Sequence, residues 1–151
     1  MAERNRYVRN RGRSRWLNRL PQALGWAVQE AAIRHAPLTV VTVHPVMASA
    51  WTGSPVILPA DEPALAQAEA AAEEAVGKAT SGRGESRPAS VTVRAISGFV
   101  AEELIGASRE AEMLVVGSRG AGGFAALRLG SVSSQLVHHS PCPVVVIPSS
   151  R

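Results

Sequence analysis

Segments with strand character alternate with segments of helical periodicity along nearly the whole chain. From about residue 17 the patterns indicate helix, strand, helix, strand, helix, strand, helix and strand, in that order. The strand segments lie near residues 38–43, 89–96, 113–117 and 142–148, and most are almost continuously apolar. Such strands, when helices join them, form parallel sheets that are covered on both faces. The sequence therefore predicts an α/β fold: an open, Rossmann-like parallel sheet with helices on both sides.

The expected helices cover about residues 19–35, 64–80, 98–112 and 131–140. The first of them places apolar residues on one face at steps of three and four: Leu20, Leu24, Ala27, Val28 and Ala31. Residues 47–63 are expected to form a loop, because Pro55, Pro59 and Pro63 interrupt regular structure there.

The beginning of the chain departs from this regular pattern. Residues 1–19 hold seven arginines against one glutamate, whereas the remainder holds nine basic residues against eleven acidic ones. We expect residues 1–16 to be a basic, flexible arm and residues 17–151 to be the domain. A doubly wound sheet normally begins with a strand, so the first strand is degenerate or absent. Residues 5–12 could fill its place, the flanking strands could close up, or the domain could be weakly folded, since unpaired buried backbone groups are costly.

Composition narrows the class of protein further. The chain has one cysteine, Cys142, so an intrachain disulfide is excluded, and a buried structural thiol is expected. The longest uncharged apolar runs are far too short to cross a bilayer, and no secretory signal is recognisable. We expect a cytoplasmic protein that does not associate with a membrane.

A glycine-rich stretch, VVGSRGAGGFAALRLGSVS, joins an expected strand to an expected helix between residues 115 and 133. In open α/β sheets, ligands bind beyond the carboxyl ends of the strands, where this loop lies. Glycines let the backbone approach an anion, and the next helix adds the positive end of its dipole. Arg119 and Arg128 could add charge, although a solvated position is favoured for each. The stretch predicts a phosphate site, with a mobile surface loop as the alternative; it is not a Walker loop, because Gly-Lys-Ser/Thr is absent.

The spacing of Gly117, Gly120 and the pair Gly130-Ser131 follows the pattern G-x2-G-x9-G-S. This pattern resembles the ATP-binding branch of the universal stress protein family, and the likeness extends over about residues 20–148. The resemblance implies five parallel strands in the order 3-2-1-4-5, with ATP, with or without Mg²⁺, over their carboxyl ends. It implies that the backbone of Val43 meets the adenine. The candidate cofactor-binding residues are Val43, Val116, Gly117, Arg119, Gly120, Gly130, Ser131, Val132 and Ser133.

The chain lacks the Val-Asp-Gly-Ser-like turn that ends the first strand in this family. The only aspartate is Asp61, and the family position falls near Arg15. We therefore expect nucleotide binding to be weaker and less selective for the base. The resemblance also implies a homodimer that pairs through the last strand, Val144–Ile147, whose apolar edge requires a cover.

The function expected from this sequence is an adenine-nucleotide-binding regulator of the stress response rather than an enzyme. No residues are nominated for catalysis or for metal binding, although slow ATP hydrolysis stays open, and His44 is expected to be a polar residue at a strand end. Two alternatives remain: a dimerisation module that has lost nucleotide binding, and a nucleic-acid-binding protein that uses the arginine arm. Nucleic acid is the less expected partner, because few aromatic residues accompany the arginines.

Overall fold

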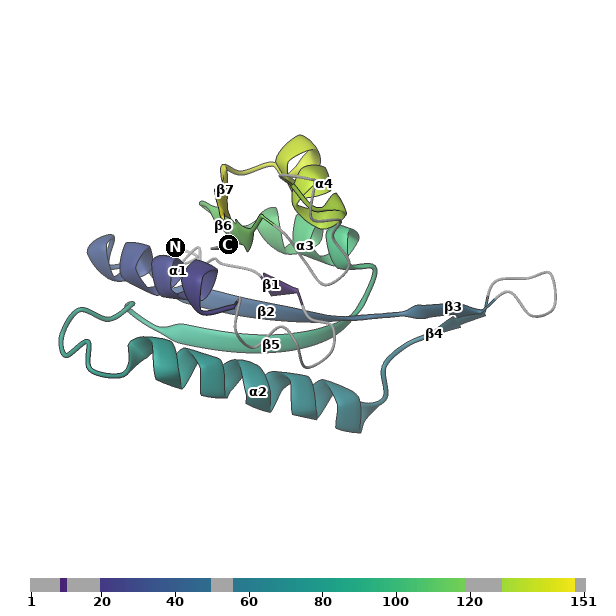
Figure 1. Cartoon of the computed structure of the whole chain (residues 1–151), viewed down its shortest axis with the longest axis horizontal. Coiled ribbons are helices and arrows are strands. Elements are labelled where there is room, and N and C mark those ends of the chain that lie inside the picture. The colour runs from purple at the N-terminus through teal and green to yellow at the C-terminus, as the bar shows by residue number, and fades with distance from the viewer. Residues whose placement is uncertain (1–8, 11–19, 50–55, 119–128, 149–151) are drawn as a thin grey trace.

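The structure is a computed structural model, and it describes residues 9–10, 20–49, 56–118 and 129–148 (Figure 1). The elements in chain order are β1 (Arg9–Asn10), α1 (Leu20–Ile33), β2 (Leu38–Pro45), β3 (Met47–Ser49), β4 (Val56–Leu58), α2 (Glu62–Thr80), β5 (Val91–Gly98), α3 (Val100–Ser108), β6 (Leu114–Gly117), α4 (Ser131–His139) and β7 (Val144–Ile147). Within these residues, none of the helices combines the length and apolar character that a membrane span requires.

The main strands are parallel, as the alternation of elements predicted. One hydrogen-bonded sheet has the order β1-β2-β5, and a second consists of β6 and β7. β1 also lies beside β6, although no ladder joins these two strands in the described part of the chain. The spatial sequence is therefore β5, β2, β1, β6 and β7, which agrees with the expected order 3-2-1-4-5 and confirms the fold class.

The first strand is present but very short. Arg9 pairs with Thr42 and Asn10 pairs with Val43, so these two residues occupy the central position of the sheet. Of the three possibilities open from the sequence, the structure therefore takes the one in which part of residues 5–12 fills the gap. The rest of the expected basic arm lies outside the described residues, and its boundary at residue 16 stays a prediction.

The prediction of a loop over residues 47–63 is wrong in part. β3 and β4 form an antiparallel hairpin, in which Met47 pairs with Leu58 and Ser49 with Val56, and Figure 1 shows it projecting from the α/β body. Pro59 directly follows β4 and so marks the end of an element, whereas Pro55 lies outside the described residues. Pro63 lies in the first turn of α2, where a missing N–H costs nothing, and Asp61 caps that helix by accepting a hydrogen bond of 2.9 Å from the N–H of Ala64.

Two apolar layers cover the sheet, one on each face. Residues of α1 pack with Leu38 and Val40 of β2, and half-buried residues of α2 join this layer. Residues of α3 and α4 pack with Val41 and Val43 on the opposite face. The face predicted for the first helix is confirmed from Leu24 to Ala31, because all four of its described members are buried: Leu24, Ala27, Val28 and Ala31. Cys142 packs against the α3–α4 layer, but it is half-buried rather than buried as expected.

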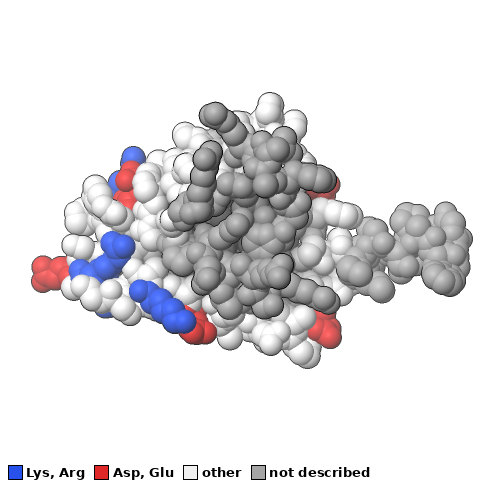
Figure 2. Space-filling view, viewed as in Figure 1, with Lys and Arg blue, Asp and Glu red and all other residues white. Residues whose placement is uncertain are grey.

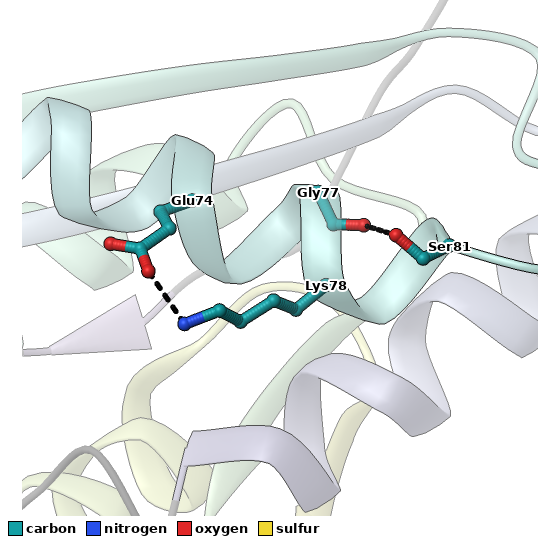
Figure 3. Close-up of polar contacts among 4 residues, drawn as sticks. All are labelled: Glu74, Gly77, Lys78 and Ser81. Atoms are coloured by element: carbon teal, nitrogen blue, oxygen red, sulfur yellow. Dashed lines mark hydrogen bonds and ion pairs between the residues drawn. The ribbon is translucent and has the colours of Figure 1, made fainter.

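The charged residues of the described surface are mixed in sign. Lys78 lies 2.5 Å from Glu74 on α2, and its hydrogen bond and charge lower the pKa of that carboxyl group (Figure 3). The pair is exposed to solvent and contributes little to stability. At the end of the same helix the Ser81 hydroxyl donates a hydrogen bond of 2.6 Å to the carbonyl of Gly77. Figure 2 shows the visible basic side chains gathered at the end of the molecule where β2 and β5 begin, with acidic side chains beside them.

Candidate functional site

The amino terminus of α4 lies at the carboxyl edge of the β6–β7 sheet. Gly130 is its N-cap residue, and the first helical hydrogen bond runs from the N–H of Ser134 to the Gly130 carbonyl, at 2.9 Å. The N–H groups of Ser131, Val132 and Ser133 therefore have no acceptor within the helix. The first turn, Ser-Val-Ser-Ser, carries no acidic residue to neutralise the helix dipole. This helix end presents a positive partial charge that favours an anion.

Hydrogen bonds fix both ends of the glycine-rich loop. At the strand end, the N–H of Ser118 donates to the carbonyl of Ile147 at 2.8 Å and so continues the β6–β7 pairing. At the helix end, the N–H of Gly130 donates to the carbonyl of Ser118 at 2.7 Å. The loop thus leaves and rejoins the body at a single point, although residues 119–128 between these ends lie outside the described residues.

Ser133 connects the same two residues through its side chain. Its hydroxyl lies 3.0 Å from the carbonyl oxygen of Ser118 and 3.1 Å from that of Gly130. The side chains of Ser118 and Ser133 are both buried. The hydroxyl hydrogen of Ser133 is therefore committed to backbone carbonyls inside the protein.

Two further candidate residues, Val43 and Val116, lie near the carboxyl ends of β2 and β6, the strands on either side of β1. Both side chains are buried in the α3–α4 layer, and Val132 of α4 packs against that layer. A ligand at this edge would therefore meet their backbone atoms, as the resemblance implies for Val43. Gly117 and Ser131 are exposed.

The structure brings seven of the nine candidate residues to one edge of the molecule: Val43, Val116, Gly117, Gly130, Ser131, Val132 and Ser133. Arg119 and Gly120 lie outside the described residues, as does Arg128. Ser118 was not among the candidates, although it anchors the loop. It makes these contacts with backbone atoms, which every residue type carries, so only its position after Gly117 could have indicated it.

The described histidines lie apart from any metal-binding cluster in the part of the chain that the structure describes. His44 is the second-last residue of β2 and pairs with Ser97, and its Nδ1 atom is buried with no described hydrogen-bond partner. His138 and His139 are exposed at the end of α4, and the Nδ1 atom of His138 lies 2.8 Å from the Ser134 carbonyl. Among the residues that the structure describes, no three His, Cys, Asp or Glu side chains gather where they could hold a metal ion.

An open parallel sheet with helices on both faces and a helix terminus at its carboxyl edge defines a doubly wound α/β protein. The sequence profile of the universal stress protein family matches residues 19–148, and the chain belongs to that family. A universal stress protein of Mycolicibacterium smegmatis is 34% identical over 125 residues, which cover 83% of this chain and 42% of the relative. One from Mycobacterium tuberculosis is 38% identical over 131 residues, covering 82% and 42%. The chain thus spans less than half the length of these relatives.

Solved structures of this family share the fold. A universal stress protein from Lactobacillus plantarum superposes with a TM-score of 0.69 at 20% identity, covering 97% of this chain and 99% of its own. A universal stress protein in complex with cAMP gives 0.67 at 22% identity, covering 99% and 100%. One from Archaeoglobus fulgidus, in complex with dAMP, gives 0.56 at 18% identity, covering 93% and 95%. At these identities the likeness establishes the architecture alone.

Proposed function

We propose that this chain binds ATP at the carboxyl edge of its sheet and acts as a regulatory nucleotide-binding protein. The observation that carries the proposal is the amino terminus of α4, whose first three N–H groups lack helical acceptors and lie beside the end of β6. Phosphates would meet these N–H groups and the glycines of the loop. The base would meet the backbone at Val43 and Val116, and Mg²⁺ would accompany the phosphates.

Adenine nucleotides are the ligand class that we propose, and two structural neighbours solved in complex with cAMP and dAMP support this choice. The spacing of Gly117, Gly120 and Gly130 supports a ligand with several phosphates, as in the ATP-binding branch of the family. The only aspartate of the chain is Asp61, so the family's position near Arg15 offers no carboxylate to the adenosine half. We therefore expect weak binding with low selectivity for the base.

The same proposal makes the chain a binding protein rather than an enzyme. None of the described side chains at the loop is placed as a general base: His44 lies on a different strand, β2, and the Ser133 hydroxyl donates to carbonyls. Binding without turnover suits a protein that reports nucleotide state to partners in the cytoplasm during stress.

Calorimetric titration of the full chain with ATP, ADP, AMP and adenosine in the presence of Mg²⁺ tests the proposal. Affinity should fall at each loss of a phosphate, because each phosphate makes charge-assisted hydrogen bonds that are about twice as strong as neutral ones. Saturable ATP binding with weaker AMP and adenosine binding supports the site. Absence of ATP binding by a cooperatively folded protein would leave the dimerisation module as the better description.

We further propose that two copies pair through β7. This strand is bonded to β6 on one side, and no described strand covers its other side. All four residues of Val144–Ile147 are apolar and half-buried. An apolar strand with a free edge invites pairing with another chain.

Replacing Val146 by proline should convert the dimer to a monomer. The carbonyls of Pro143 and Ile147 accept hydrogen bonds from β6, so the alternation of a parallel ladder turns the N–H of Val146 toward the free edge. Proline removes that N–H while the inner ladder stays intact. Light scattering after size exclusion gives the mass of each species. Val146→Ala is the matched control, because it loses packing but keeps the N–H, and a Val146→Pro dimer would refute pairing at this edge.

A further inference from the structure

The buried contacts of Ser133 reach beyond its own helix. Ser133 is the third residue of α4, and a serine there can bond the carbonyl of its own N-cap, as it does with Gly130 at 3.1 Å. Its hydroxyl also lies 3.0 Å from the carbonyl of Ser118, fifteen residues away at the end of β6. One side chain thus spans the two ends of the glycine-rich loop.

The backbone of Ser118 is fully used in this arrangement. Its carbonyl accepts from the N–H of Gly130 and from the Ser133 hydroxyl, and its N–H donates to Ile147. Ser118 is 7% exposed and Ser133 is 4% exposed, so bulk water has little access to replace a lost donor. Buried polar groups that are fully hydrogen-bonded make a local structure rigid.

We propose that the Ser133 hydroxyl is a clamp: it holds Ser118 and Gly130 together and so sets the direction of the N–H groups of Ser131 and Val132. Ser133 is then a positioning residue, which acts on the nucleotide through the helix terminus rather than by giving its hydroxyl to phosphate. This inference rests on the proposed ATP site, and it means that one buried hydroxyl fixes the geometry of the phosphate-binding helix terminus. The clamp acts on the phosphate half of the ligand and leaves the adenosine half unchanged.

The test compares ATP and adenosine binding to the full chain and to three variants. Ser133→Ala removes the hydroxyl and should weaken ATP binding about threefold to tenfold, the worth of one net hydrogen bond, while adenosine affinity changes less than about twofold. Ser133→Thr keeps the hydroxyl and should restore ATP affinity. Ser134→Ala is the matched control: it makes the same change one residue along, and in the described structure the Ser134 hydroxyl makes no hydrogen bond.

A second readout does not depend on the ligand. Amide hydrogen exchange at Gly130 should be faster in Ser133→Ala than in Ser134→Ala, since the clamp holds this N–H against the Ser118 carbonyl. Equal ATP affinities of wild type, Ser133→Ala and Ser134→Ala would overturn the clamp while the ATP site stands. Equal losses for ATP and adenosine would also overturn it, because they indicate general destabilisation. A wild-type chain that binds no ATP would refute the proposed function and the clamp with it.

Discussion

Replacing Ser131 by glutamate is expected to weaken ATP binding by about tenfold to a hundredfold without destabilising the fold. Ser131 is the first residue of α4, is exposed, and lies where the proposed phosphates approach the helix. A carboxylate there repels the phosphates, and solvent screening keeps the loss below the Coulomb energy of a buried pair. The same carboxylate lies at the positive end of the helix dipole, where it stabilises a helix by about 0.3–1 kcal/mol. Binding and stability should therefore change in opposite directions.

The matched control is Ser131→Gln, which has nearly the size and shape of glutamate without its charge. Calorimetry should show a modest loss of ATP affinity for Gln and a much larger one for Glu. Adenosine should bind both variants alike, because it brings no phosphate to the helix terminus. Thermal unfolding should place the Glu variant at or above the wild type. Equal ATP affinities for Glu and Gln would show that the phosphates do not bind at this terminus.

The order of the four helices and of β2, β5, β6 and β7 could be predicted, because each of these elements has a recognisable local sequence pattern. The segments that became β2 and β7 are rich in valine, and the helix segments repeat apolar residues at the period that a helix requires. Alternation of the two then dictates a parallel sheet. The side chains of β5 are more exposed than those of β2. This agrees with the position of β5 at the edge of its sheet.

β1 could not be predicted by the same reasoning. Arg9 and Asn10 have little tendency to form strands. They pair with Thr42 and Val43 because the buried backbone N–H and C=O groups of β2 require hydrogen-bond partners on that side. This requirement comes from the tertiary structure and leaves no trace in the local sequence. The β3–β4 hairpin was missed for a related reason. Its strands are only three residues long, and prolines near them suggested a loop.

The location of the candidate site could be predicted, and the roles within it only partly. Glycines between a strand and a helix point to the loop, and the topology rule places that loop at the carboxyl edge. The residue type does not determine whether a serine hydroxyl points into the protein or toward solvent. Ser131 and Ser133 are two positions apart in the same first turn, yet Ser131 is exposed and Ser133 is 4% exposed. A helix turns by about 200° over two residues, so neighbouring serines can have different functions.

Truncating Leu136 to alanine is expected to lower the free energy of unfolding by about 3 kcal/mol. Leu136 is fully buried on α4, in the layer that also holds Val43 and Val116. This loss has two parts: the transfer free energy of the removed side-chain atoms, which are no longer buried, and the cost of the cavity that they leave. Urea unfolding of the wild type and the variant gives the difference. Val137→Ala is the matched control, because Val137 is the next residue and is 47% exposed, so its change should stay within about 0.5 kcal/mol.

The same variant connects the core to the nucleotide site. α4 carries Leu136 on its buried side and the proposed phosphate site at its amino terminus, so ATP should bind only when this helix is docked. ATP at a hundred times its dissociation constant stabilises a native state by about 2.7 kcal/mol. Saturating ATP should therefore restore most of the stability that Leu136→Ala loses, and adenosine at the same concentration should restore less. A loss of stability below about 1 kcal/mol would show that α4 is not packed as the structure has it. A loss that ATP does not offset would show that ATP does not bind at this helix.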